Sequence, residues 1–110
     1  MRKMDSIIIH CSATRQGADF GAADIARWHR QRGFRDIGYH YVIRLDGTLE
    51  KGRPIEQAGA HCKGWNAASI GICYIGGLDA NGKPADTRTP EQKEALRKLV
   101  KELQRKYGIR

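Results

Sequence analysis

Histidines and cysteines are the side chains of this 110-residue chain best suited to metal binding and proton transfer. Neutral imidazole and thiolate are preferred zinc ligands, and imidazole is also a general base near neutral pH. The set comprises His10, His29, His40, His61, Cys11, Cys62 and Cys73. Their spacing contains neither an HExxH motif nor a CxxC pair. Spacing alone therefore does not predict a zinc site, and it excludes a four-cysteine zinc knuckle.

His10 and His61 are the histidines best placed to meet a ligand. His10 ends a predicted strand, and the ends of strands in α/β sheets border the crevices where ligands bind. His61 lies in a loop bracketed by Gly59 and Gly64, which leaves it accessible. Cys11 follows His10 directly, but neighbours on a strand point to opposite faces, which argues against a Cys–His nucleophile. We expect the cysteines to be reduced and mostly buried.

The other two histidines lie on predicted regular elements. His29 is next to Trp28 on a predicted helix, and we expect a structural role for it. His40 stands between Tyr39 and Tyr41 on a predicted strand. Strand residues alternate between faces, so His40 is predicted to face one side and both tyrosines the other.

Hydrophobic patterning predicts the elements that position these residues. The predicted strands cover residues 6–10, 39–45, 48–51 and 69–75, with a hairpin turn at 46–47; the predicted helices cover 22–32 and 90–107; and the loops cover 11–20, 52–68 and 76–88. The second helix has a strong start, because Thr89 and Gln92 form a capping box around Pro90, and Gly108 ends it. This order predicts an α/β fold with a central mixed β-sheet flanked by helices.

Composition restricts the possible functions. The chain carries 20 Lys and Arg against 12 Asp and Glu, a formal net charge of +8, with 40% hydrophobic residues. These values indicate one globular domain and exclude a multidomain enzyme, a coiled coil and a collagen-like rod. A basic protein favours polyanionic partners, such as nucleic acid or bacterial wall polymers. Clustered basic residues interleaved with aromatics are absent from the sequence, so we expect no nucleic-acid partner.

The hydrophobic runs predict no membrane partner. The longest, residues 7–9, is far shorter than the roughly 20 residues that cross a bilayer. No apolar segment follows the basic pair Arg2–Lys3, so we expect synthesis in the cytoplasm without a secretory signal.

Several segments, in order, resemble the zinc-dependent N-acetylmuramoyl-L-alanine amidases, the family of phage lysozyme-type amidases and peptidoglycan recognition proteins. The segments are residues 7–14 (IIIHCSAT), Ile25, Trp28 and His29 with 33–34 (GF), 36–41 (DIGYHY), 46–48 (DGT), 59–61 (GAH), Asn66, 69–72 (SIGI), 76–77 (GG) and 89–92 (TPEQ). The resemblance covers nearly the whole chain. It implies a hydrolase that acts on the cell wall and cleaves peptidoglycan between N-acetylmuramic acid and L-alanine.

The resemblance also implies roles for particular residues. His10 corresponds to a zinc ligand and Tyr39 to the tyrosine that assists catalysis. His61 and Asn66 would line the groove for sugar and stem peptide. Trp65 would offer a flat face for sugar stacking, or else pack on the body of the protein.

The family's other two zinc ligands, a histidine and a cysteine, follow the second long helix, and no residue here corresponds to them. We therefore expect residues 1–110 to form one amidase-like domain without its last strand, which would begin at Ile109. Three explanations remain open: a shortened product of a longer amidase, a non-catalytic peptidoglycan-binding module, or a partner chain that supplies ligands. An uncovered sheet edge would favour pairing between chains.

Overall fold

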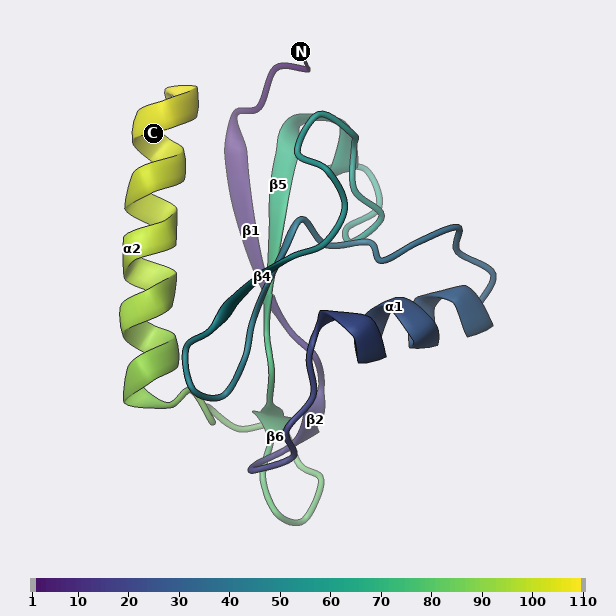
Figure 1. Ribbon diagram of the computed structural model, residues 1–110, viewed down its shortest axis with the longest axis vertical. Helices are drawn as coiled ribbons and strands as arrows, with labels where there is room; N and C mark the ends of the chain where they lie inside the picture. The colour runs from purple at the N-terminus through teal and green to yellow at the C-terminus, as the bar shows by residue number, and fades with distance from the viewer. Residues whose placement is uncertain (1, 110) are drawn as a thin grey trace.

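A four-stranded mixed sheet in the order β1-β5-β3-β4 organises the chain in the computed structural model, which describes residues 2–109. The strands are β1 (Ser6–Cys11), β3 (Tyr41–Ile43), β4 (Leu49–Lys51) and β5 (Ser69–Tyr74), and a second small sheet pairs β2 (Thr14–Arg15) with β6 (Gly77–Leu78). β5 runs parallel to β1 and β3, whereas β4 is antiparallel to β3. Helices α1 (Ala22–Gln31) and α2 (Pro90–Tyr107) lie on either side of the sheet (Figure 1). The predicted fold class is confirmed.

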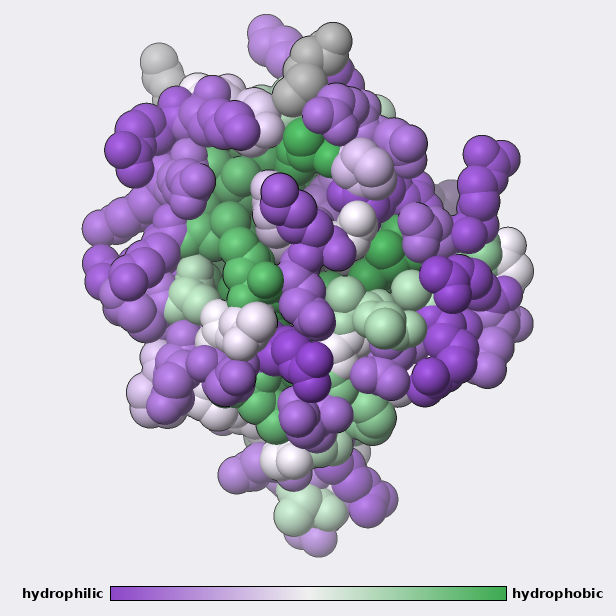
Figure 2. Space-filling model, in the orientation of Figure 1, coloured by the Kyte–Doolittle hydropathy of each residue, from purple (hydrophilic) through white to green (hydrophobic). Residues whose placement is uncertain are grey.

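Each face of the sheet carries its own hydrophobic cluster. Ile70 and Ile72 of β5 face α2 and pack with an apolar stripe that includes Leu99. Cys73 of the same strand faces α1 and packs against Ile25. Figure 2 shows hydrophilic residues over most of the visible surface, with hydrophobic residues in the seam between α2 and the sheet. Successive residues of β5 therefore serve two cores, which explains why the strand reads as a continuous apolar run.

The capping box predicted for the second helix is present. Thr89 Oγ1 accepts a hydrogen bond from the backbone N–H of Gln92 at 3.0 Å, and Gln92 Oε1 accepts one from the N–H of Thr89 at 2.9 Å. The fully buried Gln92 also donates to the carbonyl of Ile75 at 2.9 Å, which ties the helix start to the end of β5. Gly108 ends the helix in the left-handed conformation, with φ of 66°.

The predicted alternation around His40 is wrong. The regular strand begins only at Tyr41, so the period of two does not extend back to Tyr39. Tyr39 packs on the α1 side of the sheet and Tyr41 on the α2 side. The two tyrosines therefore serve opposite faces of the molecule.

Three further differences concern strands. The apolar run of β1 is typical of a buried strand, but β1 is an edge strand and Ile9 is 49% exposed. The short strands β2 and β6 lie in segments predicted as loops. Ile109 begins no strand; it is buried beside α2, and its N–H donates to the carbonyl of Gln104 at 3.0 Å. Arg110, the next residue of that predicted strand, lies outside the described residues.

Neither helix in residues 2–109 has the length and apolar character needed to cross a bilayer.

Candidate functional site

Three aromatic rings from separate segments meet on the α1 side of the sheet. His10 comes from β1, Tyr39 from the segment before β3, and His61 from the loop after β4. The ring centroid of His10 lies 5.3 Å from that of Tyr39 and 5.0 Å from that of His61. Nε2 of His10 and Nδ1 of His61 are 2.9 Å apart, which is hydrogen-bonding distance. The structure thus brings together three residues that are far apart in the sequence.

Gly71 of the central strand makes room for His61. A Cβ atom at Gly71 would lie 2.5 Å from Cδ2 of the His61 ring, closer than real Cβ contacts allow. The imidazole therefore lies flush against the backbone of β5. Nε2 of His61 is also 3.3 Å from the hydroxyl of Ser69 on the same strand.

The loop that carries His61 is held by two residues. Asn66 Oδ1 accepts hydrogen bonds from the backbone N–H groups of His61 and Cys62, both at 2.9 Å. The guanidinium of Arg2 donates to the carbonyls of Ile55 at 3.0 Å and Ser69 at 2.9 Å, which joins the two ends of the loop. Sequence reasoning did not identify Arg2, because nothing in its local pattern indicates contacts so far along the chain.

The protonation states of His61 and Tyr39 follow from burial. Burial lowers the pKa of His61 to about 4, and positive charge at His10, His40, Arg2 and Arg53 contributes to the shift. Burial also raises the pKa of Tyr39 far above its ordinary value, and the neighbouring Cys73 thiol adds to this effect. Near neutral pH, His61 is therefore an uncharged imidazole and Tyr39 a protonated phenol that can donate a hydrogen bond.

His29 supports the segment that carries Tyr39. Its ring centroid is 5.5 Å from that of Tyr39, and its Nδ1 accepts a hydrogen bond from the buried N–H of Gly38 at 2.9 Å. These contacts match the structural role predicted for His29.

A cavity of about 450 Å³ opens beside the rings of Tyr39 and His61, and His10 lies behind them, outside the cavity lining. Tyr39, His61 and Asn66, which the sequence analysis singled out, line it. Arg32 and Phe34, which sequence reasoning missed, form part of its wall, with the guanidinium carbon 5.5 Å from the ring centroid. Lys63 also lines it. The wall is therefore aromatic and positively charged.

Trp65 lies outside the lining of this cavity. It is 58% exposed and precedes the short 3-10 helix Asn66–Ala68. More than half of its surface is therefore open to solvent.

The described residues do not complete a zinc site. No group of three or more His, Cys, Asp or Glu side chains in residues 2–109 is arranged to hold a metal ion. Catalytic zinc needs three protein ligands, and here only the ring nitrogens of His10 and His61 converge. Cys73 is fully buried in the cluster under α1.

Comparison with known proteins gives consistent matches. A family model described as N-acetylmuramoyl-L-alanine amidase matches residues 1–110. The endolysin of Klebsiella phage KP32 is 45% identical over 106 residues, which are 96% of this chain and 70% of that protein. The solved N-acetylmuramoyl-L-alanine amidase LysC from Clostridium intestinale URNW superposes with a TM-score of 0.83 at 33% identity, over 98% of this chain and 67% of that chain. Wild-type Drosophila PGRP-LB superposes with a TM-score of 0.81 at 26% identity, over 99% of this chain and 65% of that chain.

Proposed function

The chain belongs to the N-acetylmuramoyl-L-alanine amidase family, and from this premise we propose that His10, Tyr39 and His61 form the reactive end of its peptidoglycan-binding groove. The protein is a peptidoglycan hydrolase that cleaves the amide bond between N-acetylmuramic acid and L-alanine. The observation that carries the proposal is the convergence of these three rings beside one cavity. Residues 1–110 act as one amidase-like domain, and its place of action is the cell wall.

Tyr39 is the hydrogen-bond donor to the reacting carbonyl. Amide hydrolysis passes through a tetrahedral intermediate whose oxygen gains negative charge, and a fixed donor stabilises that charge. Burial raises the pKa of Tyr39, so the phenol keeps its proton at neutral pH. The rings of His10 and His29, both within 5.5 Å of the Tyr39 centroid, hold it in place.

His61, Asn66 and Trp65 contact substrate. His61 lines the cavity as an uncharged imidazole, which can accept or donate a hydrogen bond to an amide of the stem peptide. Asn66 sets the loop that forms one wall, and its exposed neighbour Trp65 provides a flat surface for a sugar ring. Arg32 and Lys63 attract the carboxylates of the stem peptide.

His10 is the zinc ligand that this chain contributes. The family is generally zinc-dependent, but residues 2–109 hold no group of three side chains arranged to bind the metal. The second candidate function, peptidoglycan binding without cleavage, is favoured by this incomplete set of ligands.

Two measurements on the purified 110-residue protein distinguish these functions. Elemental analysis gives zinc per chain after loosely bound metal has been removed. Labelling of newly exposed amino groups on purified peptidoglycan reports the L-alanine ends that amidase cleavage releases. Cleavage with about one zinc per chain supports the hydrolase. Binding to peptidoglycan with neither zinc nor new amino groups supports the binding module.

A further inference from the structure

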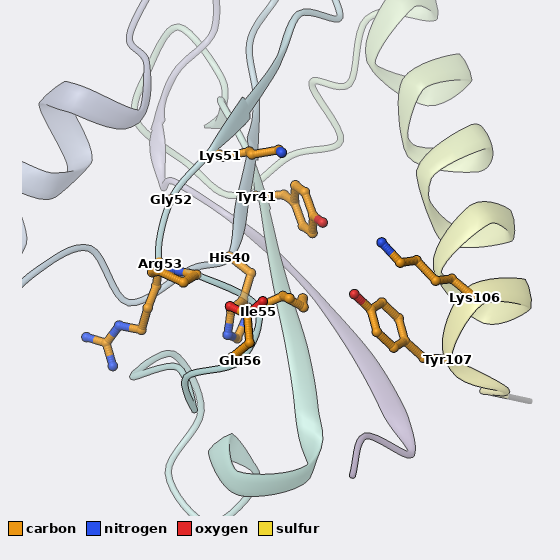
Figure 3. A pocket seen from close by; sticks show the side chains of 10 residues that line it. His40, Tyr41, Lys51, Gly52, Arg53, Ile55, Glu56, Lys106 and Tyr107 are labelled. Atoms are coloured by element: carbon orange, nitrogen blue, oxygen red, sulfur yellow. The ribbon is translucent and has the colours of Figure 1, made fainter. Parts of the chain in front are cut away.

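A second cavity, of about 540 Å³, lies on the face of the sheet opposite the groove. Its walls are the β3–β4 hairpin, the segment 53–56 and the last turn of α2 (Figure 3). Tyr41 in its wall packs with the α2-side cluster, whereas Tyr39 of the groove packs with the α1-side cluster. The proposed function uses none of the polar side chains that extend into this cavity.

Four hydrogen-bond donors point into the cavity from two elements. Lys51 and Tyr41 extend from the hairpin, and Lys106 and Tyr107 extend toward them from α2 (Figure 3). Within residues 2–109, neither lysine takes part in an ion pair and neither phenol in a hydrogen bond between side chains. Two of these side chains contact each other, since the Lys106 ammonium lies 5.5 Å from the ring centroid of Tyr107. Two ammonium groups and two phenols thus face the same solvent-filled space.

The charge of the cavity favours an anion. Lys51 and Lys106 face one carboxylate in the wall, that of Glu56, and a second carboxylate, that of Glu102, lies near Tyr41. Arg53 adds positive charge, although its guanidinium is held by the carbonyls of Ile37 at 3.1 Å and Ala58 at 2.9 Å. Lys51 and Lys106 extend toward the same space from two sides, so both would attract an anion placed there.

The phenol of Tyr41 remains a donor at neutral pH. Burial raises the pKa of Tyr41, and nearby negative charge at Glu102 and Glu56 adds to the shift. A protonated phenol can donate to an oxyanion without adding negative charge to the site.

We propose that this cavity binds a phosphate group through Lys51, Lys106 and the hydroxyls of Tyr41 and Tyr107. A phosphate presents several strong acceptor oxygens, and lysine binds it as a point charge. The apolar side chain of Ile55 in the wall can contact the carbon skeleton that carries the phosphate. The chemistry suits a free phosphate ester and a phosphate within a polymer equally. A polymer held here would tether the hydrolase near its substrate and raise the effective concentration at the groove.

The test is a titration of the full chain with inorganic pyrophosphate at low ionic strength, followed by backbone amide NMR. We expect saturable shifts centred on residues 41, 51 and 106–107. The Lys51→Met/Lys106→Met variant should weaken binding by at least about tenfold. The matched control is Lys93→Met/Lys98→Met, which removes two charges from α2 outside the cavity and should bind as the parent does. Equal weakening in both variants would mean that only net charge matters and would overturn the proposal.

Tyr107→Phe separates binding from folding, because it keeps the ring and removes only the hydroxyl. We expect pyrophosphate binding to weaken several-fold with an unchanged melting temperature, and undiminished binding would contradict the proposed contact.

Citrate tests the ligand class: citrate binding as tight as that of pyrophosphate would overturn specificity for phosphate. A soluble phosphodiester polymer that binds more tightly than pyrophosphate identifies the polymer as the source, and equal binding identifies a free ester. None of these readouts depends on cleavage of peptidoglycan.

Discussion

The imidazole of His61 lies against the backbone of Gly71, where a Cβ atom would come within 2.5 Å of the ring. This contact positions the ring that lies 2.9 Å from Nε2 of His10. A loop histidine is thereby fixed by the central strand of the sheet rather than by its own loop alone. The geometry of the site therefore depends on the absence of a side chain.

Gly71→Ala should displace His61 and disturb the site. Overpacking of this kind costs about 1–3 kcal/mol in the free energy of unfolding, and we expect muropeptide binding to weaken as well. Chemical denaturation and calorimetric titration measure the two effects. The control is His61→Ala/Gly71→Ala: once the ring is removed, the added methyl group should cost much less than it does in the parent. Additive costs would mean that the two residues are not coupled.

His10→Ala should lower the zinc content of the protein. An imidazole ligand contributes a direct bond to the metal, and the loss of that bond weakens zinc binding. Elemental analysis of the dialysed variant measures the metal content. One zinc per chain in this variant would remove His10 from the ligand set.

Tyr39→Phe should lower turnover while zinc content, fold and KM stay near those of the parent. The substitution removes one hydrogen-bond donor to the developing oxyanion, a loss that typically reduces kcat by about 10²–10³-fold. Steady-state kinetics on purified peptidoglycan give kcat and KM separately. An unchanged kcat would show that the phenol takes no part in the reaction.

Arg2→Met should loosen the loop that carries His61. The variant loses charged hydrogen bonds to the carbonyls of Ile55 and Ser69, and we expect a loss of about 1–3 kcal/mol in the free energy of unfolding. Limited trypsin digestion should also cut faster after Lys63, which is exposed in that loop. Arg97→Met is the control, since among residues 2–109 the Arg97 side chain forms only an exposed pair with Glu94 and its loss should change little. Equal cutting rates in parent and Arg2→Met would contradict the role of Arg2.

Cys73 should resist alkylation in the folded protein. It is fully buried, and burial raises its pKa to about 12, so almost no thiolate is present at about pH 8. Mass spectrometry after iodoacetamide treatment should find Cys73 unlabelled in buffer and labelled in denaturant. Half-buried Cys62 provides the comparison in the same molecule and should be labelled first. Rapid labelling of Cys73 in buffer would mean that the cluster under α1 opens readily.

Local signals in the sequence predicted most of the fold. Thr89, Gln92 and Gly108 define α2 through short-range capping, and the apolar run of β5 is long enough to read directly. The face of Tyr39 was predicted wrongly, because alternation holds only inside a regular strand and the chain is irregular before Tyr41. Two-residue strands such as β2 are set by pairing with a distant partner, so no local pattern indicates them.

Local signals in the sequence also predicted part of the site. His10 and Tyr39 occur in short segments that resemble a known family, and the glycine-bracketed loop indicated that His61 is accessible. Arg2 and Gly71 act through contacts with residues remote in the sequence, which only the folded chain reveals. Arg32 and Phe34 likewise line the cavity only because the end of α1 meets the loop after β4 in the folded chain.

The parallel pairing of β1 with β5 has a consequence for biosynthesis. Ser6 pairs with Ser69, so the first strand has no partner until most of the chain has been made. Contacts between such distant residues form slowly, because closing the long loop between them costs conformational entropy. During translation, His10 emerges from the ribosome long before His61 and the strand on which His61 rests. A nascent chain therefore cannot assemble its reactive site early, and hydrolytic competence is delayed until synthesis has passed β5.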